Sequence, residues 1–329
     1  MSRELRVGAA TSAVLLAVSA PVAAQAAPAP LAALQTLDAR VQSVGWRLTR
    51  GNARFCRGAV PGIGLQLQDA AGYADPRAIR AALRLPGDIA VGAVAADSPA
   101  SRAGLAANDP LVEVAGQQAA ALPRARPGDY ARLANLHDRI DAALAATARV
   151  ALVRLRNGRE ERLEIAGEPA CPSRFEMLSE GTRAAADGRR VVVGRKLVER
   201  FPEDELLAAV LAHELAHNLL GHRARLDAQG RAWSTVKATE READRLSVWL
   251  LTNAGYPPEA AVRFFERWGP ANDLGIFTEP THDRWETRAK RVAAEIAKMR
   301  AAMAPDPTGA ANWAVDFRMT HSHRVIPAK

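Results

Sequence analysis

The sequence predicts an α+β fold that combines a mainly helical unit with a smaller β-rich unit. With 329 residues, the chain is long enough for about two domains with their own cores. Apolar residues at helical spacing dominate its second half, whereas β-branched runs separated by turn residues occur in its first half. Helices are expected at Leu206–Leu220 and Ser234–Asn253, and strands at Ile89–Val94, Arg149–Leu155 and Glu161–Ile165, the last two joined by a turn at Asn157-Gly158.

Another helix is expected near the beginning of the chain. The apolar residues there recur at helical spacing, which predicts an amphipathic helix from Leu31 to Leu48. These residues are Leu34, Leu37, Val41, Val44 and Leu48.

The first 26 residues have the pattern of a targeting segment. Arg3 and Arg6 precede an apolar run over 7–22, and the small residues Ala24-Gln25-Ala26 follow it. This pattern is typical of a secretory signal peptide cleaved near Ala26, so the mature protein is expected in the periplasm or outside the cell. A retained anchor helix is the alternative. No other stretch is apolar enough to cross a bilayer.

The most informative motif is His213-Glu214-Leu215-Ala216-His217, which lies inside the helix expected at 206–220. Residues four apart share one face of a helix, so both imidazoles can bind one zinc ion while Glu214 acts on a water molecule. A catalytic zinc needs a third protein ligand. The next expected helix carries Glu240 and Asp244 on one face. Glu240 can bind the metal, and Asp244 can accept the second ring N–H of a ligand histidine.

Two neighbouring residues are less suited to bind the metal. Glu242 points about 160° away from Glu240 on the same helix, and His222 would lie about 140° round the helix from His217. His222 is therefore interpreted as structural. The alternative for the whole group is a core helix with hydrogen-bonded histidines and solvated acidic residues, but a charged Glu214 on a mostly apolar helix argues against it.

Over residues 175–302 the chain resembles the gluzincin zinc metallopeptidases of the HtpX, CAAX prenyl endopeptidase and BepA type. Besides the two motifs above, Thr281-His282 followed by Arg288 is similar to the T-H-P-x-x-x-x-R segment of that family, with Asp283 in place of the proline. The resemblance implies one zinc ion per chain. It implies His213, His217 and Glu240 as metal ligands, Glu214 as general base, Asp244 and Arg288 behind the ligands, and His282 close to the metal as an oxyanion stabiliser or a cap.

The same resemblance implies how substrate is held. Gly188–Gly194 is similar to the edge strand of a small sheet that aligns extended peptide in gluzincins, through main-chain hydrogen bonds that give loose sequence preference. It also implies that the helix at 31–48 packs on the protease domain.

A second module is expected upstream. Ser98–Leu105 and Asn108–Gly116 resemble the signature of bacterial PDZ domains, in which a short helix precedes a strand and a turn. The resemblance implies that Gly62, Ile63, Gly64 and Leu65 form the loop whose backbone N–H groups bind a peptide carboxylate.

The two cysteines flank this module. An exported chain with two cysteines is expected to form one disulfide, here Cys56 to Cys171, near the adjacent termini of the PDZ-like domain. Two unpaired thiols are the alternative.

The expected organisation therefore has five parts. These are a signal peptide (1–26), a helix packing on the protease domain (27–57), a PDZ-like domain (58–168), a zinc metallopeptidase domain (169–305) and a tail (306–329). The net charge is +8, or +7 without the signal peptide, because Arg3, Glu4 and Arg6 sum to +1. The basic residues are spread along the chain, and no nucleic-acid motif accompanies them.

Together these features predict a zinc metalloendopeptidase that cleaves unfolded or misfolded envelope proteins, recognised by their exposed C-termini or apolar segments. Two alternatives stay open: a latent or chaperone-like PDZ binding protein, and a regulatory protease with one specific partner.

Overall fold

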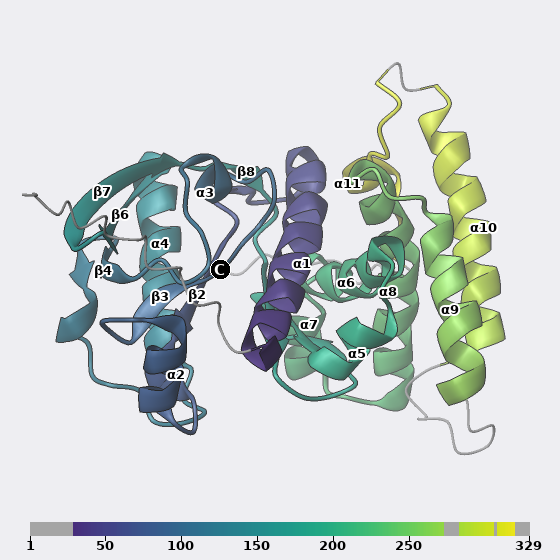
Figure 1. Cartoon of the computed structure of the whole chain (residues 1–329). Helices are drawn as coiled ribbons and strands as arrows, with labels where there is room; N and C mark the ends of the chain where they lie inside the picture. Colours follow the sequence, from purple (N-terminus) through teal and green to yellow (C-terminus); the bar gives the residue numbers. More distant parts are fainter. Residues whose placement is uncertain (1–28, 273–282, 306–307, 320–329) are drawn as a thin grey trace, which may run out of the picture.

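Helix α1 (Ala29–Asn52) lies between a β-rich unit and a helical unit (Figure 1). The structure is a computed structural model that describes residues 29–272, 283–305 and 308–319. The helix predicted at 31–48 is confirmed and extends to Asn52. Val41, Val44 and Leu48 are buried in the core of the helical unit. Gly45 faces the ring of Phe175, where a Cβ atom would lie 2.3 Å from the nearest ring carbon. This close approach seats α1 on the strand that carries Phe175.

The β-rich unit contains three small antiparallel sheets, whose strands are ordered β5-β4-β6-β7, β2-β3 and β1-β8. Leu136 and Leu144 of one long helix are buried against Leu152 of β6 and Ile89 of β3. The elements are β1 (Val60–Gly62), β2 (Leu65–Asp69), α2 (Pro76–Leu83), β3 (Ile89–Val94), α3 (Pro99–Arg102), β4 (Leu111–Val114), β5 (Gln117–Gln118), α4 (Ala131–Thr147), β6 (Arg149–Arg156), β7 (Arg159–Ala166) and β8 (Glu168–Ala170).

The predicted strand at 89–94 and the predicted hairpin are both confirmed, as β3 and as β6 with β7. Asn157 and Gly158, at φ 52° and 74°, form the two-residue turn. Positive φ at both positions matches the turn that suits the twist of an antiparallel pair.

The two ends of the β-rich unit are held together. Strand β1 pairs with β8, and this brings the chain entering the unit beside the chain leaving it. Cys56 and Cys171 lie just outside these strands with their Cα atoms 5.5 Å apart and form a disulfide. The bond closes a long loop across both ends of the unit.

The helical unit is built around α6, whose side chains are buried on nearly every face. Trp249 of α8 and Phe265 of α9 belong to the same core. The elements are β9 (Arg174–Leu178), β10 (Ala184–Ala186), β11 (Arg190–Gly194), α5 (Arg195–Arg200), α6 (Asp204–Leu219), α7 (His222–Gln229), α8 (Trp233–Asn253), α9 (Glu259–Asn272), α10 (Trp285–Met303) and α11 (Trp313–Asp316). The two helices predicted around the histidine and acidic motifs are confirmed as α6 and α8.

The prediction that residues 188–194 form an edge strand is wrong. Strand β11 is the central strand of the order β10-β11-β9, antiparallel to β10 and parallel to β9. The edge next to α6 is β10, a run of three alanines. The β-branched valines of β11 suit a strand that is paired on both sides.

The units are joined by polar contacts as well as by α1. Arg174 of β9 binds Asp138 and Asp141 of α4, at 3.1 and 2.9 Å. In the described ranges, no helix combines the length and apolar character needed to span a membrane. The expected signal peptide, His282 and the residues of the tail beyond 319 lie outside those ranges.

Candidate metal centre

Three side chains from two helices converge at one point of the helical unit. His213 and His217 extend from α6 and Glu240 extends from α8, and one ligand atom of each lies within 4.8 Å of the other two. The two Nε2 atoms are 3.2 Å apart. Nε2 of His213 is 3.3 Å from Oε2 of Glu240, and Nε2 of His217 is 3.5 Å from Oε1 of Glu240. The structure thus brings together the three residues that the sequence proposed as metal ligands.

These separations have the dimensions of a zinc site. Nitrogen and oxygen ligands at 2.0–2.1 Å from a tetrahedral zinc lie roughly 3.3–3.4 Å from one another. The distances between the three ligand atoms are 3.2, 3.3 and 3.5 Å, so each lies close to that range. Two imidazoles and one carboxylate are a common ligand set for a catalytic zinc, and they leave a fourth position free for water or substrate. The residues present therefore fit the metal.

A carboxylate lies behind the first histidine. Nδ1 of His213 is 3.0 Å from Oδ1 of Asp244, one turn beyond Glu240 on α8. Asp244 is buried, and Arg288 of α10 donates hydrogen bonds to both of its oxygens. This contact fixes the ring of His213 so that its Nε2 faces the other ligands.

The pKa values of the two histidines in the cluster are shifted in opposite directions. Burial disfavours the charged form of His213, but Asp244 and Glu240 outweigh it and raise the pKa of His213 to about 10. Burial lowers the pKa of His217 to about 3. Near neutral pH the metal-free pair therefore carries one positive charge, on His213, and a metal ion that binds this ring would displace the extra proton.

A second set of contacts lies behind His217, and the sequence analysis did not predict it. Nδ1 of His222 is 2.9 Å from Nδ1 of His217, and Nε2 of His222 is 3.2 Å from Oε2 of Glu242. Arg225 binds the same oxygen at 2.7 Å. Glu242, the poorer ligand candidate from sequence, contacts His222 and Arg225 instead of the three-residue cluster. The interpretation of His222 as structural is incomplete, because it also contacts His217, a proposed ligand.

Glu214 follows the first ligand on α6 and is half-buried. It lies about 100° round the helix from His213 and about 60° from His217, so it stands beside the metal face without belonging to it. Its place on α6 next to His213 agrees with the role of general base that the sequence predicts for it. His282 lies outside the described residues.

Asp283, which stands in place of the proline of the T-H-P-x-x-x-x-R segment, forms ion pairs that link two helices. Asp283 accepts two hydrogen bonds from Arg241 of α8, at 2.8 and 3.0 Å, and one from Arg291 of α10, at 2.8 Å. These arginines lower the pKa of Asp283 to about 2. The carboxylate ties the chain preceding α10 to the helix that carries Glu240.

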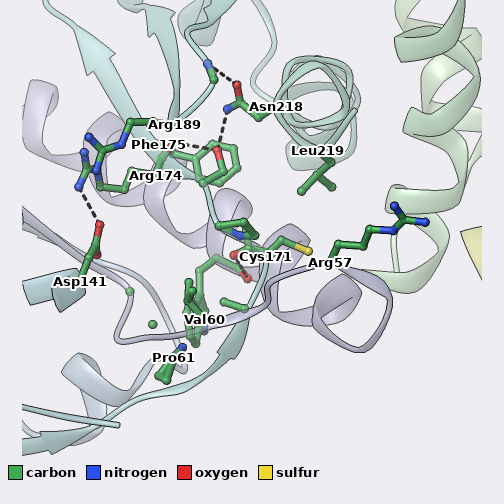
Figure 2. Close-up of a pocket in the computed structure, with 18 of the residues that line it drawn as sticks. Arg57, Val60, Pro61, Asp141, Cys171, Arg174, Phe175, Arg189, Asn218 and Leu219 are labelled. Atoms are coloured by element: carbon green, nitrogen blue, oxygen red, sulfur yellow. Dashed lines mark hydrogen bonds and ion pairs between the residues drawn. The ribbon is translucent and has the colours of Figure 1, made fainter. Parts of the chain in front are cut away.

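A cavity of about 960 Å³ lies away from the metal ligands, between the two units. Its lining includes the four loop residues predicted to bind a carboxylate, Gly62 to Leu65, and His137 of α4. Figure 2 shows Val60 and Pro61 on one side of it, and Asn218 and Leu219, at the end of α6, on another. The predicted recognition loop and the helix of the metal centre therefore border one cavity.

Gly64 shapes the segment from Gly62 to Leu65. This residue has φ +65°, and a Cβ atom on it would lie 2.5 Å from Cβ of Ser98. The carbonyl groups of Ile63 and Gly64 accept hydrogen bonds from Ala100 and Ala95. The loop is thus held against the start of α3, with glycine required at its tightest point.

Comparison with known proteins points to the same part of the chain. No curated protein matches the sequence. Residues 182–323 match the family model of Peptidase family M48. This segment contains α6 and α8, and hence all three residues of the metal cluster. Residues 182–323 are therefore a domain of the Peptidase M48 type, which indicates that the chain is a metallopeptidase, a hydrolase of peptide bonds.

Proposed function

We propose that this protein is a zinc-dependent metalloendopeptidase that binds one zinc ion per chain through His213, His217 and Glu240. The observation that carries the proposal is the set of three ligand separations, 3.2, 3.3 and 3.5 Å, which match the edges of a zinc tetrahedron. The Peptidase family M48 match over the same helices supports it.

The residues around the site supply the acid–base chemistry. Bound zinc would act as a Lewis acid toward the peptide carbonyl and the attacking water. Glu214 takes a proton from that water as it attacks, and then delivers the proton to the amine that leaves. Asp244 keeps the ring of His213 oriented throughout.

We place the extended substrate along β10 rather than along β11. In the described part of the chain, β10 pairs with β11 alone, so its other edge can accept a peptide by main-chain hydrogen bonding. Strand β10 also packs next to α6, which carries His213 and His217. The alanines of β10 leave room for substrate side chains, and this favours loose sequence preference.

The β-rich unit supplies the second contact with substrate in this proposal. Its PDZ-like loop, Gly62 to Leu65, borders the 960 Å³ cavity. Arg57 also lines this cavity, and it is exposed. An extended chain end could place its carboxylate at the loop. The partners proposed are unfolded envelope proteins with exposed C-termini, met in the periplasm or outside the cell.

The test compares the wild type with Glu214→Gln for zinc content and for cleavage of unfolded casein. About one zinc per chain in both proteins, with cleavage by the wild type alone, is the expected result. Glu266→Gln, an exposed change on α9, serves as the control and should leave both measurements unchanged.

Absence of zinc and absence of cleavage would contradict different parts of the proposal. A wild type without zinc would overturn the ligand assignment. Zinc in both proteins without cleavage by either would favour a latent or binding protein led by the β-rich unit.

A further inference from the structure

We propose that His222 and Glu242 are positioning residues that hold His217 in the orientation needed to bind metal. The inference rests on the proposed zinc site and extends it to residues outside the ligand set. It starts from a continuous series of side-chain contacts, from His217 to His222 at 2.9 Å, then to Glu242 at 3.2 Å, and finally to Arg225 at 2.7 Å.

A break in the helix makes these contacts possible. On a continuous helix His222 would point about 140° away from His217. Helix α6 instead ends at Leu219, and Gly221 adopts φ +64° before α7 begins at His222. The left-handed turn changes the direction of the chain, and His222 packs edge-on against the ring of His217, with ring centroids 4.8 Å apart. One turn later on α7, Arg225 reaches the same carboxylate.

The chemistry of the partners sets the direction of each hydrogen bond. A carboxylate of Glu242 paired with arginine can only accept, so Nε2 of His222 carries the hydrogen. In a neutral ring, Nδ1 of His222 is then an acceptor, and Nδ1 of His217 donates to it. This leaves Nε2 of His217 without a hydrogen, with its lone pair directed toward Nε2 of His213 and Glu240. It is the tautomer that binds a metal ion.

The arrangement repeats the one behind the other ligand. His213 contacts Asp244, which is held by Arg288, whereas His217 contacts His222, which is held by Glu242 and Arg225. Each series ends in a buried carboxylate paired with an arginine. His222 and Glu242 are 1% and 0% exposed, so solvent cannot supply the same hydrogen bonds if either is removed.

The decisive experiment measures the zinc affinity of the full chain by competition with a chromophoric chelator, and the absorption spectrum of its cobalt(II) form. His222→Leu removes the acceptor and should weaken zinc binding by about 10- to 100-fold, with a changed cobalt spectrum. His222→Asn places an amide oxygen near the position of Nδ1, and should recover most of the affinity and of the spectrum. Arg223→Ala, an exposed neighbour on α7, is the control and should match the wild type.

Glu242→Gln provides a second test that preserves side-chain volume. Its effect on zinc affinity should be smaller in the His222→Leu background than in the wild type, because both changes interrupt one series of contacts. A folded His222→Leu protein with wild-type zinc affinity and cobalt spectrum would overturn the inference and leave the proposed function standing. So would equal losses for His222→Leu and His222→Asn, which would indicate only a packing role. A wild type that binds no zinc would instead refute the proposed function.

Discussion

Arg288 donates two hydrogen bonds to Asp244, at 2.9 and 2.7 Å, and both side chains are buried. The fork of the guanidinium matches the two carboxylate oxygens, so the pair is directional as well as charged. It joins α10 to α8 directly behind His213. The same guanidinium lies 4.5 Å from the ring centre of Phe265 on α9. One side chain thus connects three helices to the metal centre.

Replacing Arg288 with methionine should destabilise the protein strongly. The change removes both hydrogen bonds from Arg288 and leaves the buried charge of Asp244 with His213 alone, which costs about 3–5 kcal/mol in the free energy of unfolding. Arg288→Lys keeps the charge but cannot form both bonds, so its loss should be smaller. Urea unfolding measures the difference. Arg300→Met on the same helix breaks an exposed pair with Glu259 and should cost less than about 1 kcal/mol. Equal losses for the two methionine variants would contradict the prediction.

Asp283→Asn should destabilise the start of α10 near neutral pH. The arginines beside Asp283 lower its pKa to about 2, so its stabilising effect is present above the ordinary value of 3.8 and is lost as pH falls through 2. Because the site is partly solvated, we expect a loss of about 1–2 kcal/mol at pH 7. The difference from the wild type should shrink between pH 4 and pH 2, as followed by thermal unfolding.

The control for this change is Asp227→Asn on α7, which breaks exposed pairs with Arg223 of the same helix and with Arg231 just beyond its end. It should have a smaller effect than Asp283→Asn. A difference between Asp283→Asn and the wild type that stays constant down to pH 2 would show that the carboxylate charge is not what stabilises the segment.

Reduction of the disulfide should lower the melting temperature. Cys56 and Cys171 are separated by 115 positions, and loss of a crosslink over so long a loop costs about 2–5 kcal/mol. The double variant Cys56→Ser, Cys171→Ser should melt at the temperature of the reduced wild type, and adding reductant to it should change nothing. Two reactive thiols in the unfolded, unreduced wild type would show that the bond does not form in the isolated protein.

The metal cluster could be predicted from sequence because its geometry is local. His213 and His217 are one turn apart on α6, and Glu240 and Asp244 are one turn apart on α8, so helical periodicity alone places each pair on one face. Only the contact between α6 and α8 is non-local. It was predicted because a catalytic zinc needs a third protein ligand in addition to the two histidines.

The remaining features depended on contacts that periodicity does not describe. The contact between His222 and His217 was not predicted because the angular argument assumed one continuous helix, whereas α6 ends before Gly221. Gly221 itself was the signal, since a glycine after the last helical turn commonly adopts positive φ and redirects the chain. The position of β11 was wrong for a different reason. A valine-rich run predicts a strand, but its neighbours in the sheet, β9 and β10, are set by tertiary structure.

The contribution of Asp38 on α1 to the stability of the protein should fall as pH rises from about 4 to about 7. Burial raises the pKa of this carboxyl to about 7, and its Oδ1 has no hydrogen-bond partner among the described residues. The folded protein therefore holds a proton on Asp38 that the unfolded chain releases near pH 4. The contribution of this one group is therefore lost between about pH 4 and about pH 7 and changes little above that range.

Asp38→Asn should remove this dependence, because the amide stays neutral at every pH. At pH 8 we expect the variant to be more stable than the wild type by roughly 2 kcal/mol. A shift in pKa from 3.8 to about 7 corresponds to about 4 kcal/mol at 1.36 kcal/mol per unit, and we expect less because the site is partly exposed. Near pH 4 the two proteins should unfold at similar urea concentrations. Glu160→Gln, an exposed change on β7, is the control and should follow the wild type at both pH values. If Asp38→Asn were less stable than the wild type at pH 8, the charged carboxylate would have to be satisfied by the fold, and the pH dependence would have another source.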